Sequence, residues 1–225
     1  YKKTFDTYWQ DTDFEYFDPT IHTEKLRAAL KAERKSGNEL PGYIFDIKPR
    51  NFQSEILEVL QSEREVHNRW RNLVVAATGT GKTVISAFDF KRVLQNNPQA
   101  KLLFVAHRME ILKQAMWTYR GVLKDNNFGE LWVDGEKPEK YDAVFASVQT
   151  LNNRILELSL GSEYYDYIVI DEVHHIKASS YRPILQKFRP KILLGLTATP
   201  ERMDGDDILT DFCNTIAAEI RLPEA

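Results

Sequence analysis

The sequence predicts an α/β fold in which a parallel sheet is covered by helices on both sides. From about residue 49 onward, short apolar segments alternate with segments whose apolar residues recur at helical spacing. Two of the short segments, residues 165–170 and 191–196, are nearly continuous apolar runs, as expected for strands that are covered on both faces. A glycine-rich turn joins a third strand directly to a helix. Sheets of this kind bind ligands at the carboxyl ends of their strands.

The elements follow in chain order. Pro49 stands where a helix would begin, and Phe52, Ile56 and Leu60 contribute to the apolar face of that helix. A second helix is expected from about Lys82, after the glycine turn, and a third follows the next strand. The expected strands are residues 72–76, 101–106, 141–146, 165–170 and 191–196.

The first 48 residues differ from the rest of the chain. Seven of the first seventeen are aromatic, and residues 22–35 predict a helix with a narrow apolar stripe. The chain also starts without Met, so we expect a piece of a longer protein. The predicted organisation is a small N-terminal extension or linker at residues 1–48, left from a truncated upstream region, and a ligand-binding domain at residues 49–225.

Composition limits the classes of function. The chain has 225 residues, of which 43% are hydrophobic and 28% charged, which is ordinary for a soluble globular protein. No apolar run approaches the roughly 20 residues of a membrane span. The single cysteine, Cys213, excludes an internal disulfide and suits a reducing, cytoplasmic location. The net charge of −3 means that nucleic acid could bind only at a local basic surface.

The segment ATGTGKT, residues 77–83, has the composition of a phosphate-binding turn. Glycines at 79 and 81 allow the backbone to turn tightly, so that its N–H groups point at phosphate oxygens, and the following helix adds its positive end. Lys82 would reach the terminal phosphates of the ligand, and the Thr83 hydroxyl would ligate Mg²⁺. The pattern G-x-x-x-x-G-K-[ST] is complete except at its first place, where Ala76 stands.

An acidic pair follows a buried strand in VIDEVHH, residues 169–175. Asp171 would hold Mg²⁺, usually through water, and Glu172 would orient or deprotonate the attacking water. The adjacent histidines do not form a zinc motif, because neighbouring side chains rarely point at one metal. The segment HIK could open a nuclease motif of the H-x-K type, but Arg182 stands where that motif requires Asp. We reject both alternatives.

A third strand ends in LGLTATPERMDG, residues 194–205. Taken in order, A-x-T-G-x-G-K-T, D-E-x-H and T-A-T-P resemble superfamily 2 helicases and translocases. More narrowly, they resemble the DEAH-like branch that includes the motor subunits of type I and type III restriction enzymes and related DNA-repair motors. The resemblance covers about residues 49–222. It implies a RecA-like P-loop NTPase lobe, the first of two such lobes, with ATP and Mg²⁺ as cofactors.

The resemblance implies further site residues. In KPRNFQ, Gln53 would read the adenine edge, with Arg50 nearby. His174, Thr197 and Thr199 would couple the nucleotide to the nucleic-acid face. His107, Arg108, Ser147 and Gln149 would touch the nucleic-acid backbone, although Ser147 stands where the family more often has Thr. The full set of expected nucleotide-binding residues is Arg50, Gln53, Thr78, Gly79, Thr80, Gly81, Lys82 and Thr83.

These features predict the ATP-binding lobe of a DNA helicase or translocase of restriction or repair type, acting on double-stranded DNA. The second lobe would supply arginines, and no Q-x-x-G-R-x-x-R-like stretch occurs in the 225 residues. We therefore expect this chain alone to bind ATP–Mg²⁺ weakly and hydrolyse it very slowly. The other partner expected is a nuclease domain or subunit, and no membrane is involved.

Two alternatives remain open. A DEAD-box RNA helicase would carry D-E-A-D and S-A-T, whereas this chain has DEVH and TATP. A non-catalytic nucleotide-binding module would not need Lys82, Thr83, Asp171 and Glu172 together.

Overall fold

The computed structural model describes residues 47–133, 135–173, 178–198 and 208–220. All of them belong to the unit of the chain that begins at Asp46. Residues 1–46 of the expected N-terminal extension lie outside the described residues, and so do His174 and Thr199, so the predictions that concern them stay predictions.

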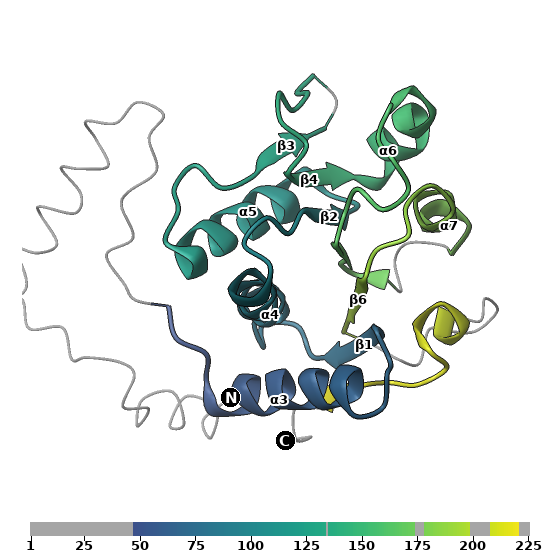
Figure 1. The fold of residues 1–225 in the computed structure, drawn as a ribbon. Coiled ribbons are helices and arrows are strands. Elements are labelled where there is room, and N and C mark those ends of the chain that lie inside the picture. The colour runs from purple at the N-terminus through teal and green to yellow at the C-terminus, as the bar shows by residue number, and fades with distance from the viewer. Residues whose placement is uncertain (1–46, 134, 174–177, 199–207, 221–225) are drawn as a thin grey trace, which may run out of the picture. The chain divides into compact units, whose positions relative to one another are not determined.

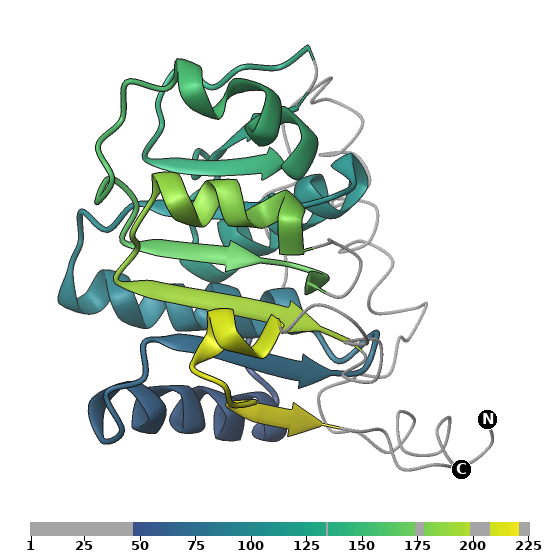
Figure 2. The same cartoon turned by 90° about the vertical axis from the view of Figure 1, so that its right-hand side faces the viewer.

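The centre of the fold is a seven-stranded sheet in the order β3-β4-β2-β5-β6-β1-β7 (Figure 1). Every neighbouring pair is parallel, so all carboxyl ends lie at one edge of the sheet (Figure 2). The strands are β1 (Arg71–Ala76), β2 (Leu102–Ala106), β3 (Glu130–Trp132), β4 (Ala143–Ser147), β5 (Tyr167–Ile170), β6 (Ile192–Thr197) and β7 (Ala218–Ile220).

Helices cover both faces of this sheet. One face carries α3 (Asn51–Glu65), α4 (Lys82–Asn96) and α5 (Met109–Leu123). The other carries α6 (Val148–Arg154), the short 3-10 helix η1 (Ile155–Glu157), α7 (Ala178–Lys187) and a second 3-10 helix, η3 (Ile208–Phe212). Figure 2 looks onto the face of α6, α7 and η3. The predicted α/β architecture, with helices on both sides of a parallel sheet, is confirmed.

The strands are apolar along their length because each face of the sheet has its own core. Along β1, Val74 and Ala76 belong to the core under α3, α4 and α5, whereas Leu73 and Val75 belong to the core under α6 and α7. Side chains alternate between faces with a period of two, so a strand buried on both sides must be apolar at every position. Among the described residues, no helix is long and apolar enough to cross a membrane.

The boundaries differ in detail from those predicted. The apolar run at 165–170 gives a strand only from Tyr167, and just before it the Asp166 carboxylate accepts hydrogen bonds from the Lys101 N–H and from Nζ of Lys191. The strands β3 and β7 were not predicted. Each has three residues and pairs with one neighbour only, so neither carries a long apolar run.

Candidate nucleotide-binding site

The glycine turn connects the carboxyl end of β1 to the first residue of α4. Gly79 and Gly81 both have positive φ angles, 86° and 79°, which strain residues that have a Cβ atom. The Thr80 hydroxyl donates to the Ala77 carbonyl at 2.7 Å and closes the turn. We call residues 77–81 the cradle. It is followed at once by α4, whose N-terminus adds partial positive charge at this edge.

Lys82 is the first residue of α4 and is 9% exposed. Its Nζ atom donates to the carbonyl of Ala76, the last residue of β1, at 3.0 Å. Burial lowers the pKa of Lys82, and the negative charges of Asp171 and Glu172 partly oppose that shift. The ammonium therefore lies at the end of β1, against the carbonyl that precedes the cradle, and the two carboxylates follow β5 at the same end of the sheet.

Asp171 and Glu172 directly follow β5. The Asp171 N–H donates to the Val105 carbonyl of β2 at 2.8 Å, which continues the sheet, and Asp171 is 4% exposed. The Glu172 N–H donates to the Asp171 carboxylate at 2.9 Å, with Glu172 at a positive φ of 55°. Burial raises the pKa of Asp171 to about 6, with Lys82 acting against the shift and Glu172 adding to it. The fold thus brings together a lysine at the start of α4, which follows β1, and an acidic pair that follows β5. In the sheet, β6 lies between β1 and β5.

The oxygen atoms at this edge fit Mg²⁺. Asp171 supplies a buried carboxylate, and Thr83 carries a hydroxyl on the first turn of α4, directly after Lys82. Hard oxygen donors are the ligands Mg²⁺ prefers, and it commonly takes only one or two carboxylates together with substrate phosphates. Within the described part of the chain, no group of three or more His, Cys, Asp or Glu side chains could enclose a metal. The donor set therefore suits Mg²⁺ carried with a phosphorylated ligand.

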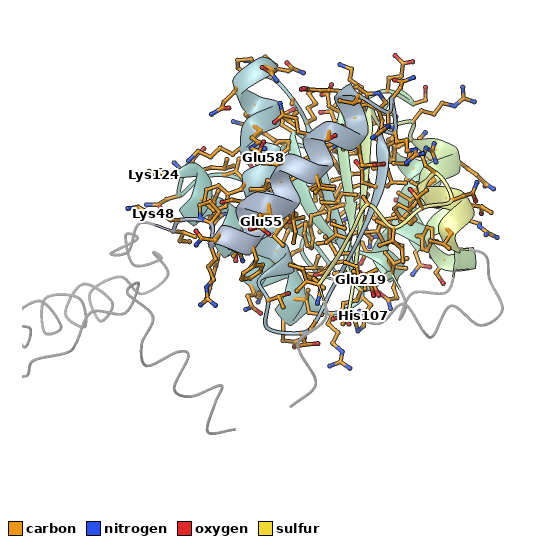
Figure 3. All side chains as sticks on the ribbon, turned by 90° about the horizontal axis from the view of Figure 1, so that it is seen from below. Lys48, Glu55, Glu58, His107, Lys124 and Glu219 are labelled. Atoms are coloured by element: carbon orange, nitrogen blue, oxygen red, sulfur yellow. The ribbon has the colours of Figure 1, made fainter. Side chains whose placement is uncertain are left out.

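Gln53 approaches the cradle from the first turn of α3. Its Oε1 atom accepts from the Arg50 N–H at 2.9 Å, and its Nε2 atom donates to the Thr80 carbonyl at 2.9 Å. Gln53 is 4% exposed, whereas Glu55 and Glu58 lie on the exposed side of the same helix (Figure 3). Both ends of the Gln53 amide are thus engaged within the protein. The implied contact of Gln53 with adenine stays a prediction. Thr78 lies exposed at the outer part of the cradle.

The remaining expected residues lie along the same edge. Thr197 ends β6 and is fully buried, paired in register with Val75 of β1. His107, labelled in Figure 3, and Arg108 follow β2. Ser147 ends β4, and its hydroxyl accepts from the Thr150 N–H at 3.1 Å, so it caps α6. Gln149 lies exposed in the first turn of α6.

The sheet order divides this edge into two parts. The cradle and the acidic pair follow β1 and β5, with Thr197 on β6 between them. The predicted nucleic-acid residues follow β2 and β4, which are neighbours on the far side of β5. The nucleotide-binding and nucleic-acid-binding residues predicted from sequence are thus adjacent in the fold but distinct.

Sequence reasoning missed a pair of buried charges that joins α3 to α4. Arg64 on α3 pairs with Asp89 on α4, and neither was predicted to be buried. One signal could have revealed Arg64. It continues the helical stripe that contains Leu57 and Leu60, so a charged side chain occupies a position facing the core.

The parallel sheet, the cradle and the facing acidic pair define the class of protein: this is the first RecA-like lobe of a superfamily 2 helicase. Residues 46–202 match the family described as the type III restriction enzyme, res subunit. Because the match covers most of the chain, the chain belongs to that family.

Individual relatives agree with this assignment. The DNA 3'-5' translocase XPB2 of Sulfurisphaera tokodaii is 28% identical over 201 residues, covering 85% of this chain and 40% of the relative. The putative ATP-dependent helicase IRC3 of Saccharomyces cerevisiae is 35% identical over 143 residues, covering 58% of this chain and 20% of the relative. The chain therefore spans 40% or less of the length of either relative.

A solved structure supports the same fold. The Sulfolobus solfataricus SWI2/SNF2 ATPase core in complex with dsDNA superposes with a TM-score of 0.58 at 19% identity. The superposition covers 78% of this chain and 37% of that chain. At this level of identity, the likeness establishes the fold alone.

Proposed function

We propose that this chain is the ATP-binding lobe of an ATP-dependent DNA helicase or translocase of restriction-subunit or repair type. In the whole protein, ATP hydrolysis would drive movement on DNA. The observation that carries the proposal is that the cradle and Lys82, which follow β1, lie at the same end of the parallel sheet as Asp171 and Glu172, which follow β5. A phosphate-binding turn opposite an acidic pair is what transfer of a phosphoryl group to water requires.

Each side chain has a part in this proposal. The N–H groups of residues 78–81 and the start of α4 hold the phosphates, and Lys82 contacts the terminal ones. Thr83 and Asp171 would hold Mg²⁺, which would neutralise part of the phosphate charge when it is bound with ATP. Glu172 orients the attacking water and takes up its proton.

The proposed DNA surface is the part of the edge that follows β2 and β4. His107, Arg108, Ser147 and Gln149 would contact the DNA backbone there. His174, Thr197 and Thr199 would link that surface to the nucleotide. Duplex DNA is the favoured substrate because one relative is a DNA translocase and the superposed ATPase core was solved with dsDNA.

The proposal includes a second RecA-like lobe, and a nuclease domain or subunit is a further candidate partner. An arginine supplied to phosphoryl transfer by such a second element is worth roughly 10³–10⁵ in rate. The 225 residues by themselves should therefore bind ATP–Mg²⁺ but turn it over very slowly. Rapid steady-state hydrolysis by this chain alone would contradict the need for a second lobe.

Titration calorimetry of the 225-residue chain with ATP and Mg²⁺ tests the nucleotide site. Lys82→Ala should abolish measurable binding, because it removes the cation under the cradle. Lys91→Ala is the matched control, since Lys91 lies on the same helix and donates to the Val122 carbonyl at 3.0 Å, away from the cradle. If ATP still bound to the Lys82→Ala protein with wild-type affinity, the assignment of the cradle would be wrong.

A further inference from the structure

A cavity of about 240 Å³ lies beside β3, the terminal strand of the sheet, on the face that carries α6. Two of its lining residues are buried: Trp132, which ends β3, and Leu158, which follows η1. Tyr141 and Leu160 complete the apolar lining, and the Tyr141 ring meets the Trp132 ring edge to face, with centroids 5.6 Å apart. Figure 1 shows β3, β4 and α6 together at the end of the sheet opposite β7.

The rim of this cavity is charged. Its exposed lining residues are Lys137, Arg154, Glu157 and Ser159. Neither Lys137 nor Arg154 forms an ion pair with a residue that the structure describes. A carboxylate arriving from outside would therefore displace no ion pair among these residues. Two cations against one anion favour a ligand that carries negative charge next to an apolar group.

The size of the cavity selects a single side chain as the ligand. Sites for small molecules and cofactors usually occupy roughly 300–1,000 Å³, whereas a cavity of about 150 Å³ already holds a benzene ring. At about 240 Å³, this cavity accommodates one aromatic ring with its stem and little more. Aromatic side chains bury much apolar area and serve as anchors in protein interfaces.

The terminal strand offers a backbone for such a ligand. Among the strands that the structure describes, β3 pairs with β4 alone. An extended peptide can add to the open edge of a sheet, where main-chain hydrogen bonds give affinity and pockets for alternate side chains give specificity. Trp132 belongs to the core under α6, whereas Leu131 packs against the core under α5. A segment paired with β3 would thus present every second side chain on the face of the cavity.

We propose that this cavity docks an extended segment of a partner protein in which one aromatic residue is flanked by acidic residues. The aromatic ring would lie between Trp132 and Leu158. The flanking carboxylates would pair with Lys137 and Arg154 at the rim. A single-stranded nucleic acid also combines rings with negative charge, but Glu157 would repel its line of phosphates.

This site is separate from the nucleotide site. In the sheet, β2, β5 and β6 lie between β4 and the strand β1 that leads into the cradle. The inference therefore goes beyond the proposed function and does not depend on it. Its failure would leave the assignment of the cradle untouched, because that assignment is tested by ATP binding to Lys82→Ala.

Titration of the ¹⁵N-labelled chain with short peptides, followed by NMR, tests the proposal. The peptide acetyl-EDFED-amide should shift the amide signals of residues 135–141 and 154–160. Replacing its ring, in acetyl-EDAED-amide, should weaken binding by about tenfold or more, because the burial of the ring is lost. Reversing its charges, in acetyl-KRFRK-amide, should weaken binding by about threefold or more, because the rim then repels the peptide.

Charge reversal at the rim tests the same contact from the protein side. Arg154→Glu should weaken binding of acetyl-EDFED-amide by about fivefold, since it replaces one of the two cations by an anion. Arg154 is exposed, so the variant should keep the fold and the rest of its NMR spectrum. Arg71→Glu is the matched control, because Arg71 is an exposed arginine on β1, at the other side of the sheet. Its affinity for the peptide should equal that of the wild type.

Each contrary outcome overturns the proposal. Equal affinity for acetyl-EDFED-amide and acetyl-EDAED-amide would show that no ring enters the cavity. Equal losses in Arg154→Glu and Arg71→Glu would show that the peptide responds to net charge alone. If octathymidylate shifted the same signals and bound more tightly than acetyl-EDFED-amide, the cavity would serve nucleic acid and not a protein segment.

Discussion

The guanidinium of Arg64 on α3 meets the carboxylate of Asp89 on α4 in two hydrogen bonds, at 2.8 and 2.7 Å, with both residues buried. Asn72 of β1 accepts from Nε of the same arginine at 2.8 Å, and Tyr167 of β5 donates its hydroxyl to the Asp89 carboxylate. Burial would lower the pKa of Arg64, but the charge of Asp89 and its hydrogen bonds raise it. This cluster joins α3 and α4 to the strands that end at the cradle and the acidic pair.

Asp89→Ala should destabilise the protein by about 3–5 kcal/mol, because it leaves the Arg64 charge buried without its partner. Urea unfolding followed by circular dichroism measures the change in the free energy of unfolding. Replacing both partners, as Arg64→Met with Asp89→Leu, should cost less than the sum of the single losses, since no uncompensated charge remains. A loss below about 1 kcal/mol in Asp89→Ala would mean that water solvates Arg64.

Gly195→Ala should destabilise the protein through crowding in the centre of β6. A Cβ atom there would lie 2.6 Å from Cζ of Phe212 and 2.9 Å from Cδ1 of Leu73. Overpacking of this kind typically costs about 1–3 kcal/mol, which urea unfolding would detect. Gly161→Ala is the control, because a Cβ at that exposed glycine would meet no atom within 4 Å. Equal stability of both variants with the wild type would show that Phe212 can move aside freely.

The fold was predictable where the signal is local. The interior strands are apolar runs, and the cradle is a contiguous motif between a strand and a helix, so both could be recognised without knowing the tertiary structure. The proximity of Lys82 and Asp171 then follows, because parallel strands bring their carboxyl ends to one edge. The three-residue strands β3 and β7 escaped prediction, since edge strands that short have little apolar pattern.

The contacts that join α3 to the cradle and to α4 were not predictable for a different reason. The bond from Gln53 to Thr80 joins residues 27 positions apart, and it exists only because α3 docks beside α4. The pairing of Arg64 with Asp89 depends on the same docking. Sequence periodicity shows that a helix has a buried face, but it does not show which helix lies opposite.

Asp166→Asn should lower the free energy of unfolding at neutral pH, and the loss should be smaller in acid. Asp166 accepts from Nζ of Lys191 at 2.8 Å and from the Lys101 N–H at 3.0 Å. Burial acts to raise the pKa of Asp166, but these hydrogen bonds and the charge of Lys191 outweigh it, so the pKa lies below its ordinary value. A carboxylate whose pKa is lowered by folding stabilises the protein at pH values above its ordinary pKa of about 4. That contribution is lost as the pH falls from about 4 through the lowered pKa.

The measurement is the difference in the free energy of unfolding between the wild type and Asp166→Asn at pH 7, 5 and 3. It should be largest at pH 7, nearly as large at pH 5, and smallest at pH 3. Glu139→Gln, at an exposed carboxylate before β4, controls for the general effect of removing one negative charge. The same difference at pH 7 and pH 3 would show that ionisation of Asp166 plays no part.

Arg108→Ala should weaken binding of duplex DNA, because Arg108 is exposed where β2 ends, on the part of the edge that we assign to DNA. Loss of one phosphate contact should reduce the affinity for every DNA sequence alike. It should also make the slope of log affinity against log salt concentration less steep by about one. Fluorescence anisotropy with labelled duplex DNA at several salt concentrations measures both quantities. Arg71→Ala is the matched control, since Arg71 is exposed at the opposite, amino end of β1. If both variants lost affinity equally, binding would reflect net charge and the assigned edge would not be the DNA surface.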